Sequence, residues 1–403
     1  METGATHDVT SHSYGTMLSI CCGVSFVCYF GSYMRIPVVP LYARSLGADS
    51  LQVGLINSAF MLMAGVLSLP LGMVSDRFGR KLLASLGLLV LSGTSFLLYF
   101  SHSPQQLVGI YVLFGIGLAA FGPTMMSVVA DFTPPTHLGR AYGWYTTSLY
   151  GAMSIGPAAG GFIAEELGYQ QVFLISGVFM ILTFWLVLFF LPRSHGDKRQ
   201  TAAGKTSAVA GELMRNRPLL ACWLATLGGC LGLGMFLTFL PLHAQNEGLS
   251  LKQIGLVFGV QGLCNALSRI PFGHLSDKVA RRSKLVVIGL VGFAASMAGF
   301  GISRSTLHFV GFAVTLGVSM GLAFTSVGAL IAEVVPPNQR GLAMGGYNTC
   351  IYLGMMLSSA GMGGFIGSIG FTNAFLLTAL INVLMIFVFH LLIKGYTPVR
   401  PAG

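Results

Sequence analysis

Long apolar stretches, separated by short polar segments, recur along the whole chain. Each is long enough, at about 20 mainly apolar residues, to cross the hydrocarbon core of a bilayer as a helix. The pattern predicts twelve spans, at residues 16–43, 51–74, 82–100, 106–129, 141–165, 169–191, 218–244, 252–275, 284–302, 306–332, 343–367 and 371–394. We therefore expect an all-α membrane protein with two six-helix bundles, a cytoplasmic linker and two cytoplasmic tails, at residues 16–191, 218–394, 192–217, 1–15 and 395–403, respectively.

The two predicted bundles repeat each other at an offset of about 200 positions. Pro70 matches Pro271 and Asp76 matches Asp277, with the same residue type and the same predicted depth in the membrane. Two parallel six-helix repeats place a binding site at their interface, near the middle of the bilayer. The repeat therefore predicts pseudo-symmetric halves with a site between them.

The positive charges are distributed unevenly between the two predicted sides. If both termini lie on one side, 17 of the 22 lysines and arginines share that side, and only Arg44, Lys252 and Arg304 lie opposite. Cytoplasmic loops carry this excess of positive charge, so both termini should be cytoplasmic. The two remaining cations, Arg35 and Arg269, fall inside predicted spans.

Composition adds to this picture. Only 8% of the residues are charged, against about a quarter in a soluble domain, and the 54 glycines suit close packing of helices. The seven cysteines lie in apolar runs and form no spaced Cys/His pattern, so we expect no metal and no cofactor. The positive net charge sets topology, so we expect no nucleic-acid partner.

A polar loop motif follows the second span. Its sequence is GMVSDRFGRK at 72–81, and the second half repeats it as GHLSDKVARR at 273–282. These segments resemble the cytoplasmic loop signature of the major facilitator superfamily, and the resemblance extends over the whole chain. It implies the twelve-helix major facilitator fold, transport by alternating access, and a gating role for Gly72, Asp76, Arg77, Gly79, Arg80, Asp131, Gly273 and Asp277.

The physical reading of this motif concerns two charges. Asp76 can occupy the positive N-terminus of a helix of the other half, which by the family's arrangement begins near Gly341. Arg80 would pair with Asp131 at the inner end of the fourth span. The alternative is that these charges only set the topology.

The fifth span carries a second motif, with Gly151 followed by GPAAGG at 156–161. It resembles the motif of the exporting, drug:proton antiporter branch of the superfamily. Proline bends the helix, and the glycines allow a second helix to pack tightly. The resemblance implies that the protein is an exporter and that its export motif comprises Gly151, Gly156, Pro157, Gly160 and Gly161. The alternative is a helix contact without directional meaning.

One departure from that branch leaves proton coupling open. Drug antiporters usually carry an arginine in the fourth span, four residues before a glycine, whereas this chain has Tyr111 before Gly115. It also has no Asp or Glu deep in any predicted span. Proton coupling commonly needs a buried group that titrates. His243, near the outer end of the seventh span, is the proton candidate, with a satisfied polar residue as the alternative.

The embedded arginines suggest where a substrate binds, because a charge in a membrane needs pairing, water or a route to the interface. Arg269 continues a polar stripe, Gln261 and Asn265, that the second span lacks at its equivalent positions. The stripe should therefore line the cavity, unless Arg269 extends to the cytoplasmic interface. Arg35 is the other candidate, unless it faces the outer headgroups. The predicted substrate-binding set is Arg35, Tyr29, Tyr33, Asn57, Tyr145, Gln261, Asn265, Arg269, Tyr347 and Asn348.

These observations favour a monomeric secondary transporter in a bacterial inner membrane that exports small amphipathic organic compounds, with proton exchange left open. The alternative is a transporter of an anionic metabolite or lipid-like anion that uses Arg35 and Arg269. A receptor or scaffold on a transporter fold is a third class, and both loop motifs argue against it. We expect no enzymatic activity, because no nucleophile–base constellation or phosphate loop is present.

Overall fold

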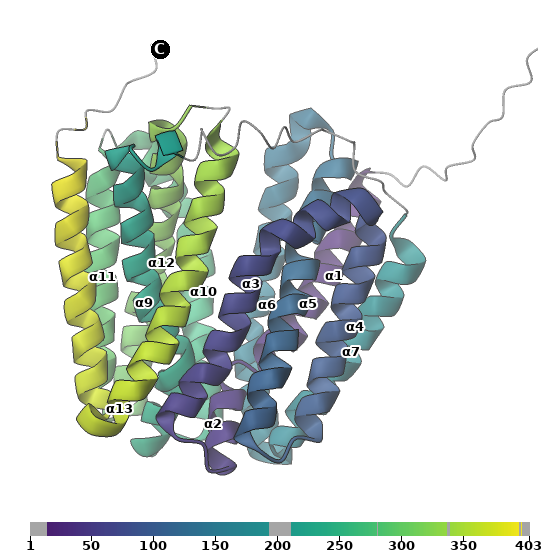
Figure 1. Ribbon diagram of the computed structural model, residues 1–403, viewed down its shortest axis with the longest axis vertical. Coiled ribbons are helices and arrows are strands. Elements are labelled where there is room, and N and C mark those ends of the chain that lie inside the picture. Colours follow the sequence, from purple (N-terminus) through teal and green to yellow (C-terminus); the bar gives the residue numbers. More distant parts are fainter. Residues whose placement is uncertain (1–13, 193–210, 280, 337–338, 395, 397–403) are drawn as a thin grey trace, which may run out of the picture.

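The structure is a computed structural model that describes residues 14–192, 211–279, 281–336, 339–394 and 396. All regular elements in these residues are helices. The first half comprises α1 (Tyr14–Met34), α2 (Val38–Ser45), α3 (Ser50–Phe78), α4 (Arg80–Tyr99), α5 (Pro104–Phe132), η1 (Pro135–His137), α6 (Leu138–Leu167) and α7 (Tyr169–Phe190). The second half comprises α9 (Arg217–Asn246), α10 (Leu251–Lys278), α11 (Arg282–Ile302), α12 (Thr306–Val334) and α13 (Arg340–Ile393). The halves stand side by side (Figure 1).

The helices confirm the twelve predicted spans. Within the described residues, nine segments are long and apolar enough to cross a membrane, counting α1 and α2 as one. The helices α6, with 30 residues, and α10, with 28, are as long as these segments but are not among the nine, and we count them as spans by their length and place in the bundles. The helix α13 crosses twice, because Gly370, at a φ of 78°, breaks it where glycine alone is unstrained. The predicted linker and tails lie mostly outside the described residues.

The apolar run at 16–43 predicted one continuous helix for the first span, but the structure divides it into two. The helix ends at Met34 and resumes as α2 at Val38. Pro37 and Pro40 lie in this region, and a proline has no backbone N–H to continue a helical hydrogen-bond ladder. The break places Arg35 in a turn instead of within a helix.

The halves meet through two helix pairs, α3 with α13 and α6 with α10, and this interface is called the seam below. Glycines allow backbones to touch along it. A Cβ atom added to Gly54 would lie 2.1 Å from the carbonyl oxygen of Ser359, and one added to Gly161 would lie 2.4 Å from that of Leu251. No side chain other than hydrogen fits at these two positions. The seam therefore depends on the absence of side chains.

One end of the seam is fixed by charge as well as by packing. This end, where α6 turns into α7 and α9 into α10, is called the far end. The backbone N–H of Lys252 donates a 2.8 Å hydrogen bond to Glu165, and the ammonium group of Lys252 pairs with Glu166. Glu165 thus contacts the positive N-terminus of α10 from the opposite half, where a carboxylate is favoured.

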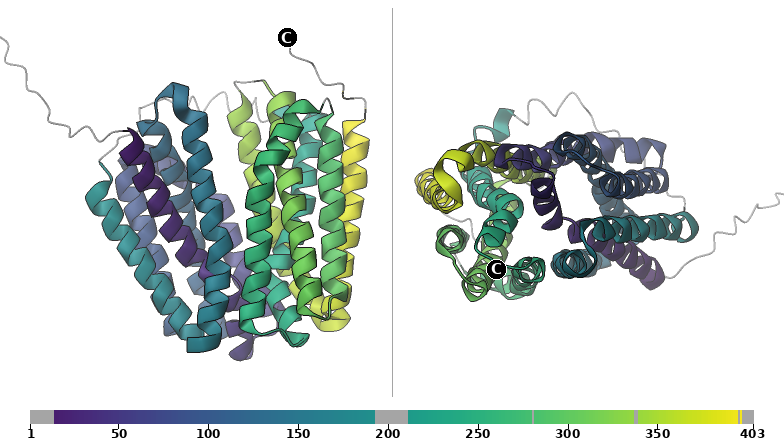
Figure 2. Two further views of the ribbon diagram at one scale, coloured as in Figure 1. Left: turned by 180° about the vertical axis from the view of Figure 1, so that it is seen from behind. Right: turned by 90° about the horizontal axis from the view of Figure 1, so that it is seen from below.

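The halves separate at the opposite end, called the basic end, where α3 turns into α4 and α12 into α13. Cβ atoms added to Gly72, Gly341 or Gly345 would meet no other described atom within 4 Å. The side chain of Asp76 is 54% exposed. The halves diverge toward this end, which is uppermost in Figure 1, and the view from behind in Figure 2 agrees. The structure is thus closed at the far end and parted at the basic end.

Adjacent glycines of α6 allow a test of the seam. Gly161 faces the second half, whereas a Cβ atom added to Gly160 would lie 1.9 Å from the carbonyl oxygen of Met34, inside the first half. We expect Gly161→Val to force the far end apart. A Leu251→Cys reporter should then react several-fold faster with a membrane-impermeant maleimide, in a background without native cysteines.

The matched control is Gly160→Val, which should instead overpack the first half. Overpacking typically costs about 1–3 kcal/mol, so this variant should lower the thermal stability and leave the labelling rate of folded protein unchanged. Equal labelling rates in both variants would contradict the assignment of Gly161 to the seam.

Candidate functional site

Tyrosines from both halves gather where α1, α6 and α13 face one another. The rings of Tyr29 and Tyr33, on α1, are 6.3 Å apart. Tyr33 lies within electrostatic range of Tyr150 on α6 and Tyr352 on α13. These four residues are called the tyrosine cluster; Tyr29, Tyr33 and Tyr150 belong to the first half and Tyr352 to the second. Sequence reasoning did not include Tyr150, because a tyrosine in a long apolar helix has no distinguishing pattern.

Arg269 joins this cluster across the seam. Its guanidinium carbon lies 4.0 Å from the centre of the Tyr150 ring, and its Nε donates a 3.3 Å hydrogen bond to Asn265. Stacking on an aromatic face stabilises a guanidinium by about 0.5–2 kcal/mol. No described carboxylate lies within ion-pair distance of Arg269. The site therefore carries a positive charge whose only described neighbours are neutral groups.

The rest of the predicted polar stripe is oriented differently. Gln261 donates to the sulfur of Met320 at 3.0 Å, so its side chain faces α12 inside the second half. Asn265 is buried and supports Arg269. Only the Arg269 end of the stripe therefore reaches the opposite half. The stripe was predicted to line the cavity along its length, but positions four residues apart on a helix differ by about 40° in direction, so the stripe turns from the opposite half toward its own bundle.

Arg35 is not part of the seam. It is completely buried, its Nη1 donates to Thr94 at 3.1 Å and Ser95 at 3.0 Å, and it stacks 3.9 Å above the ring of Phe114. All these partners belong to the first half. The hypothesis that Arg35 and Arg269 share one cavity, and the alternative that Arg35 faces the outer headgroups, both disagree with this geometry. The proline break after α1 turns the side chain into its own bundle.

The remaining predicted binding residues occupy varied environments. Tyr347 lies within electrostatic range of Arg269 and Tyr150, so it borders the tyrosine cluster. Tyr145 is buried beside Ser25 and Tyr29 in the first half. Asn57 is buried on α3, and Asn348 is exposed on α13. The structure therefore brings Tyr29, Tyr33, Tyr347 and Arg269 together and leaves the other predicted residues at its margins or in the bundles.

The loop motif builds an ion-pair network at the basic end. Arg80 forms an ion pair with Asp131 and donates a hydrogen bond to the carbonyl oxygen of Ser127. Its guanidinium group also lies 3.3 Å from the carboxylate of Asp76. Gly79 has a φ of 101°, which explains the glycine between α3 and α4. A Cβ atom added to Gly72 would meet nothing within 4 Å, and one added to Gly273 would lie 3.9 Å from Thr325. Arg77 lies over the ring of Phe78.

The second half repeats this network. Arg282 pairs with Glu333 at 2.9 Å, as Arg80 does with Asp131. The sequence contains the signal for this pair, because Ala332-Glu333 aligns with Ala130-Asp131 in the internal repeat. The side chain of Asp277 lies outside the described part of the structure.

The glycines of the fifth-span motif divide between two partners. Gly156 and Gly160 pack against the backbone of α1, at Phe30 and Met34. Pro157 and Gly161 face the second half, since a Cβ atom added to Gly255 would lie 2.8 Å from the carbonyl oxygen of Pro157. A Cβ atom added to Gly151 would lie 3.9 Å from Phe26, so Gly151 is not tightly packed.

His243 lies at the far end of the second half. Its Nε2 is 3.0 Å from the carbonyl oxygen of Phe300, and its Nδ1 is 4.0 Å from Glu247, which pairs with Arg304 at 2.5 Å. Three aromatic rings pack around the imidazole, those of Phe309, Phe371 and Phe375. The proton candidate is therefore enclosed in the second bundle, apart from the tyrosine cluster.

Comparison with known sequences gives consistent relatives. An uncharacterized MFS-type transporter of Methanocaldococcus jannaschii is 24% identical over 373 residues, which is 92% of this chain and 96% of that protein. A quinolone resistance protein NorA of Staphylococcus aureus is 25% identical over 300 residues, covering 73% of this chain and 76% of that protein. Another strain's NorA is 27% identical over 250 residues, or 61% and 63%.

Solved structures share the fold. A bacterial homologue of the human lysosomal transporter Spinster, in an inward-facing and unoccupied conformation, superposes with a TM-score of 0.79 and 16% identity over 96% of this chain and 99% of that chain. The nucleoside transporter NupG, as its D323A mutant, superposes with a TM-score of 0.80 and 14% identity over 94% and 100%.

The family profile of the Major Facilitator Superfamily matches residues 21–259 and again 222–402, which together take in both halves. The repeat, the loop motifs and the twelve spans agree with this match. The chain is a multi-pass membrane protein and a transporter that belongs to the Major Facilitator Superfamily.

Proposed function

We propose that the protein exports small amphipathic organic compounds by alternating access, and that they bind at the tyrosine cluster beside Arg269. One observation carries the proposal: residues of both halves form this aromatic and cationic site at the seam. Binding energy gained there depends on how the halves are arranged, so binding and the rearrangement of the halves are coupled.

The chemistry of the site favours one class of substrate. Four tyrosines provide apolar faces with hydroxyl groups at their edges, which suits a molecule with both apolar and polar parts. Arg269 adds a positive charge without a described carboxylate partner, so a neutral molecule with a negative pole, or an anion, is favoured over a lipophilic cation. In the alternative, in which the substrate is an anionic metabolite or lipid-like anion, the anion would bind Arg269 without Arg35.

Three observations support export and its direction. The NorA relatives are named for quinolone resistance, and the fifth span carries the glycine–proline motif on which the export hypothesis depends. The excess of positive charge favours a cytoplasmic basic end in a bacterial inner membrane. The structure would then be the state that accepts substrate from the cytoplasmic side. Release would require the far end to part and the basic end to close.

Closing the basic end gives Asp76 a role. It now pairs with Arg80 of its own half, and the start of α13 is the nearest equivalent of the helix N-terminus that Glu165 contacts at the far end. We infer that the two ends use the same interaction in opposite states, a carboxylate of the first half on a helix N-terminus of the second. Proton exchange would then have to use carboxylates or His243 near the ends of the spans.

Replacing Arg269 tests the substrate class. Arg269→Gln keeps a hydrogen-bonding side chain and deletes the charge, so we expect at least a tenfold higher KM for an amphipathic anion, equivalent to about 1.4 kcal/mol, and a smaller effect on a neutral amphipath. Arg269→Lys should restore transport only in part, because lysine lacks the planar guanidinium. Transport into inverted vesicles measures both.

The control is Arg44→Gln, which removes an exposed arginine at the far end and should leave both KM values unchanged. Efficient export of lipophilic cations by the unmodified protein, or an equal loss for all substrates in Arg269→Gln, would contradict the proposed selectivity.

Replacing Asp76 tests the closing of the basic end. Asp76→Asn removes a charge–helix interaction of about 0.3–2 kcal/mol, so the parted state should gain population by roughly two- to thirtyfold. A Gly345→Cys reporter should react faster with a maleimide added at the basic end, and transport should fall. Asp49→Asn, at the far end of the same helix, is the matched control because asparagine also caps helices. Unchanged labelling in Asp76→Asn would exclude the gating role.

A further inference from the structure

A groove crosses the outside of the seam between α3 and α13. It encloses about 310 Å³, which is at the lower limit of typical ligand pockets. Leu62, Val66 and Leu69 of α3 form one wall, and Thr349, Tyr352 and Leu353 of α13 form the other. Both halves of the transporter therefore contribute to one largely apolar groove. Tyr352 is the one residue that this groove shares with the tyrosine cluster.

The outer side of this groove faces the bilayer. The side chains of Leu62, Val66 and Leu69 are 42%, 59% and 70% exposed. The same helical face carries exposed Leu51 and Leu55 toward the far end, where the seam is closed. A face that remains exposed beside a closed seam lies on the outer surface of the protein, so it contacts acyl chains.

Tyr352 belongs both to the groove and to the tyrosine cluster. Tyr352 lines the groove and also lies within electrostatic range of Tyr29 and Tyr33 in the cluster. Its position depends on Gly65, because a Cβ atom there would lie 2.8 Å from the Cβ of Tyr352. A rotation of the Tyr352 side chain would thus connect the lipid-facing groove with the tyrosine cluster.

We propose that this groove is a lateral binding site, through which the apolar part of an amphipathic substrate passes from the bilayer to the tyrosine cluster. The proposal rests on the proposed function, since it gives the route to that site. An amphipath partitions into the bilayer and is concentrated beside α3 and α13. The groove shares Tyr352 with the proposed binding site, and its apolar walls match the apolar part of such a molecule.

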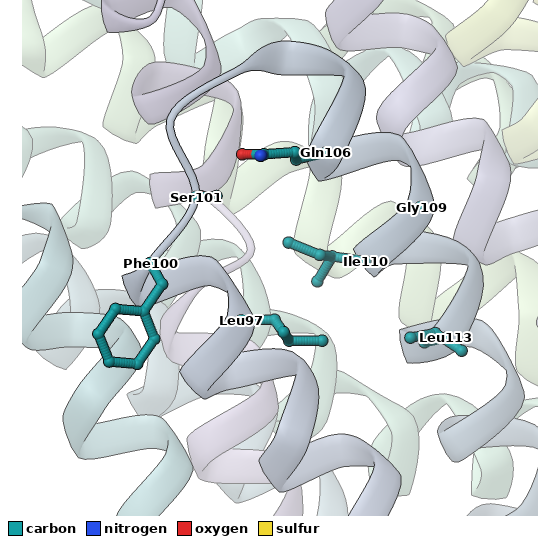
Figure 3. A pocket seen from close by; sticks show the side chains of 7 residues that line it. All are labelled: Leu97, Phe100, Ser101, Gln106, Gly109, Ile110 and Leu113. Carbon is teal, nitrogen blue, oxygen red and sulfur yellow. The ribbon is translucent and has the colours of Figure 1, made fainter.

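The molecule contains a matched control groove. Figure 3 shows a second apolar pocket, formed by Leu97 of α4 and Phe100 just after it, with Ile110 and Leu113 of α5. Its volume is about 410 Å³. It lies near the far end and within the first half alone. It offers lipid-facing space of similar character without a connection to the tyrosine cluster.

The test uses the amphipathic anion 1-anilinonaphthalene-8-sulfonate as the probe. Val66→Cys and, as control, Leu113→Cys are made in a protein without native cysteines. Both variants are reconstituted in liposomes and labelled with lipid-soluble N-phenylmaleimide. The probe should slow labelling at position 66 at least fivefold and leave position 113 unchanged. In a second arm, Val66→Trp should fill the groove and reduce probe export at least fivefold, whereas Leu113→Trp should not.

Each outcome decides something definite. Equal protection at both positions would mean that the probe only partitions into lipid, and it would overturn the lateral site. Slow labelling at position 66 that the probe does not change would indicate a resident lipid and also overturn it. Loss of the groove effects while export of the probe remains sensitive to Arg269→Gln would overturn the lateral site and leave the proposed function intact. No export and no protection would overturn both.

Discussion

Contact of backbone with backbone at the seam holds the two halves of this transporter together. Gly54 and Gly161 bring α3 to α13 and α6 to α10 so closely that a single methyl group would not fit. At these glycines the two backbones meet without side chains between them, so the halves can change their angle about these contacts. The charged groups at the two ends are then free to determine which end is closed.

The ends illustrate this division of roles. At the far end, Glu165 contacts the N-terminus of α10 and Lys252 pairs with Glu166, so opposite charges hold the halves together. At the basic end, Arg80–Asp131 and Arg282–Glu333 are each contained within one half. Pairs of this second kind stiffen a bundle without joining it to the other. The tyrosine cluster and Arg269 lie between the two ends, where a change in angle alters their spacing.

Much of the fold could be predicted from sequence, because a bilayer constrains both length and polarity of a span. The twelve spans and the internal repeat follow from spacing, and the Arg80–Asp131 pair was expected from the resemblance of the loop motif to its family signature. Side-chain direction was harder to predict. Arg35 and Arg269 are both embedded arginines, yet one faces its own bundle after a proline break and the other faces the opposite half. Periodicity identifies the face of a helix, whereas the partner of that face depends on how helices pack.

The same limit applies to the glycine motif of α6 and to the far-end ion pair. Gly160 and Gly161 are adjacent in sequence and pack against different halves, since successive residues of a helix differ by about 100° in direction. Glu165, Glu166 and Lys252 were visible as charges near span ends, and only the structure showed that they meet across the seam. Arrangement of the repeats, more than residue type, determines which charges can meet.

Distances between spin labels at the two ends test alternating access at this seam most directly. One pair, at Arg140 and Arg340, reports on the basic end, and a second, at Gln170 and His308, reports on the far end. Both pairs join exposed positions of opposite halves. With an amphipathic anion bound in liposomes, the basic-end distance should shorten and the far-end distance should lengthen in the same fraction of molecules. A change at one end alone, or lengthening at both, would contradict rotation of the halves about the glycine contacts.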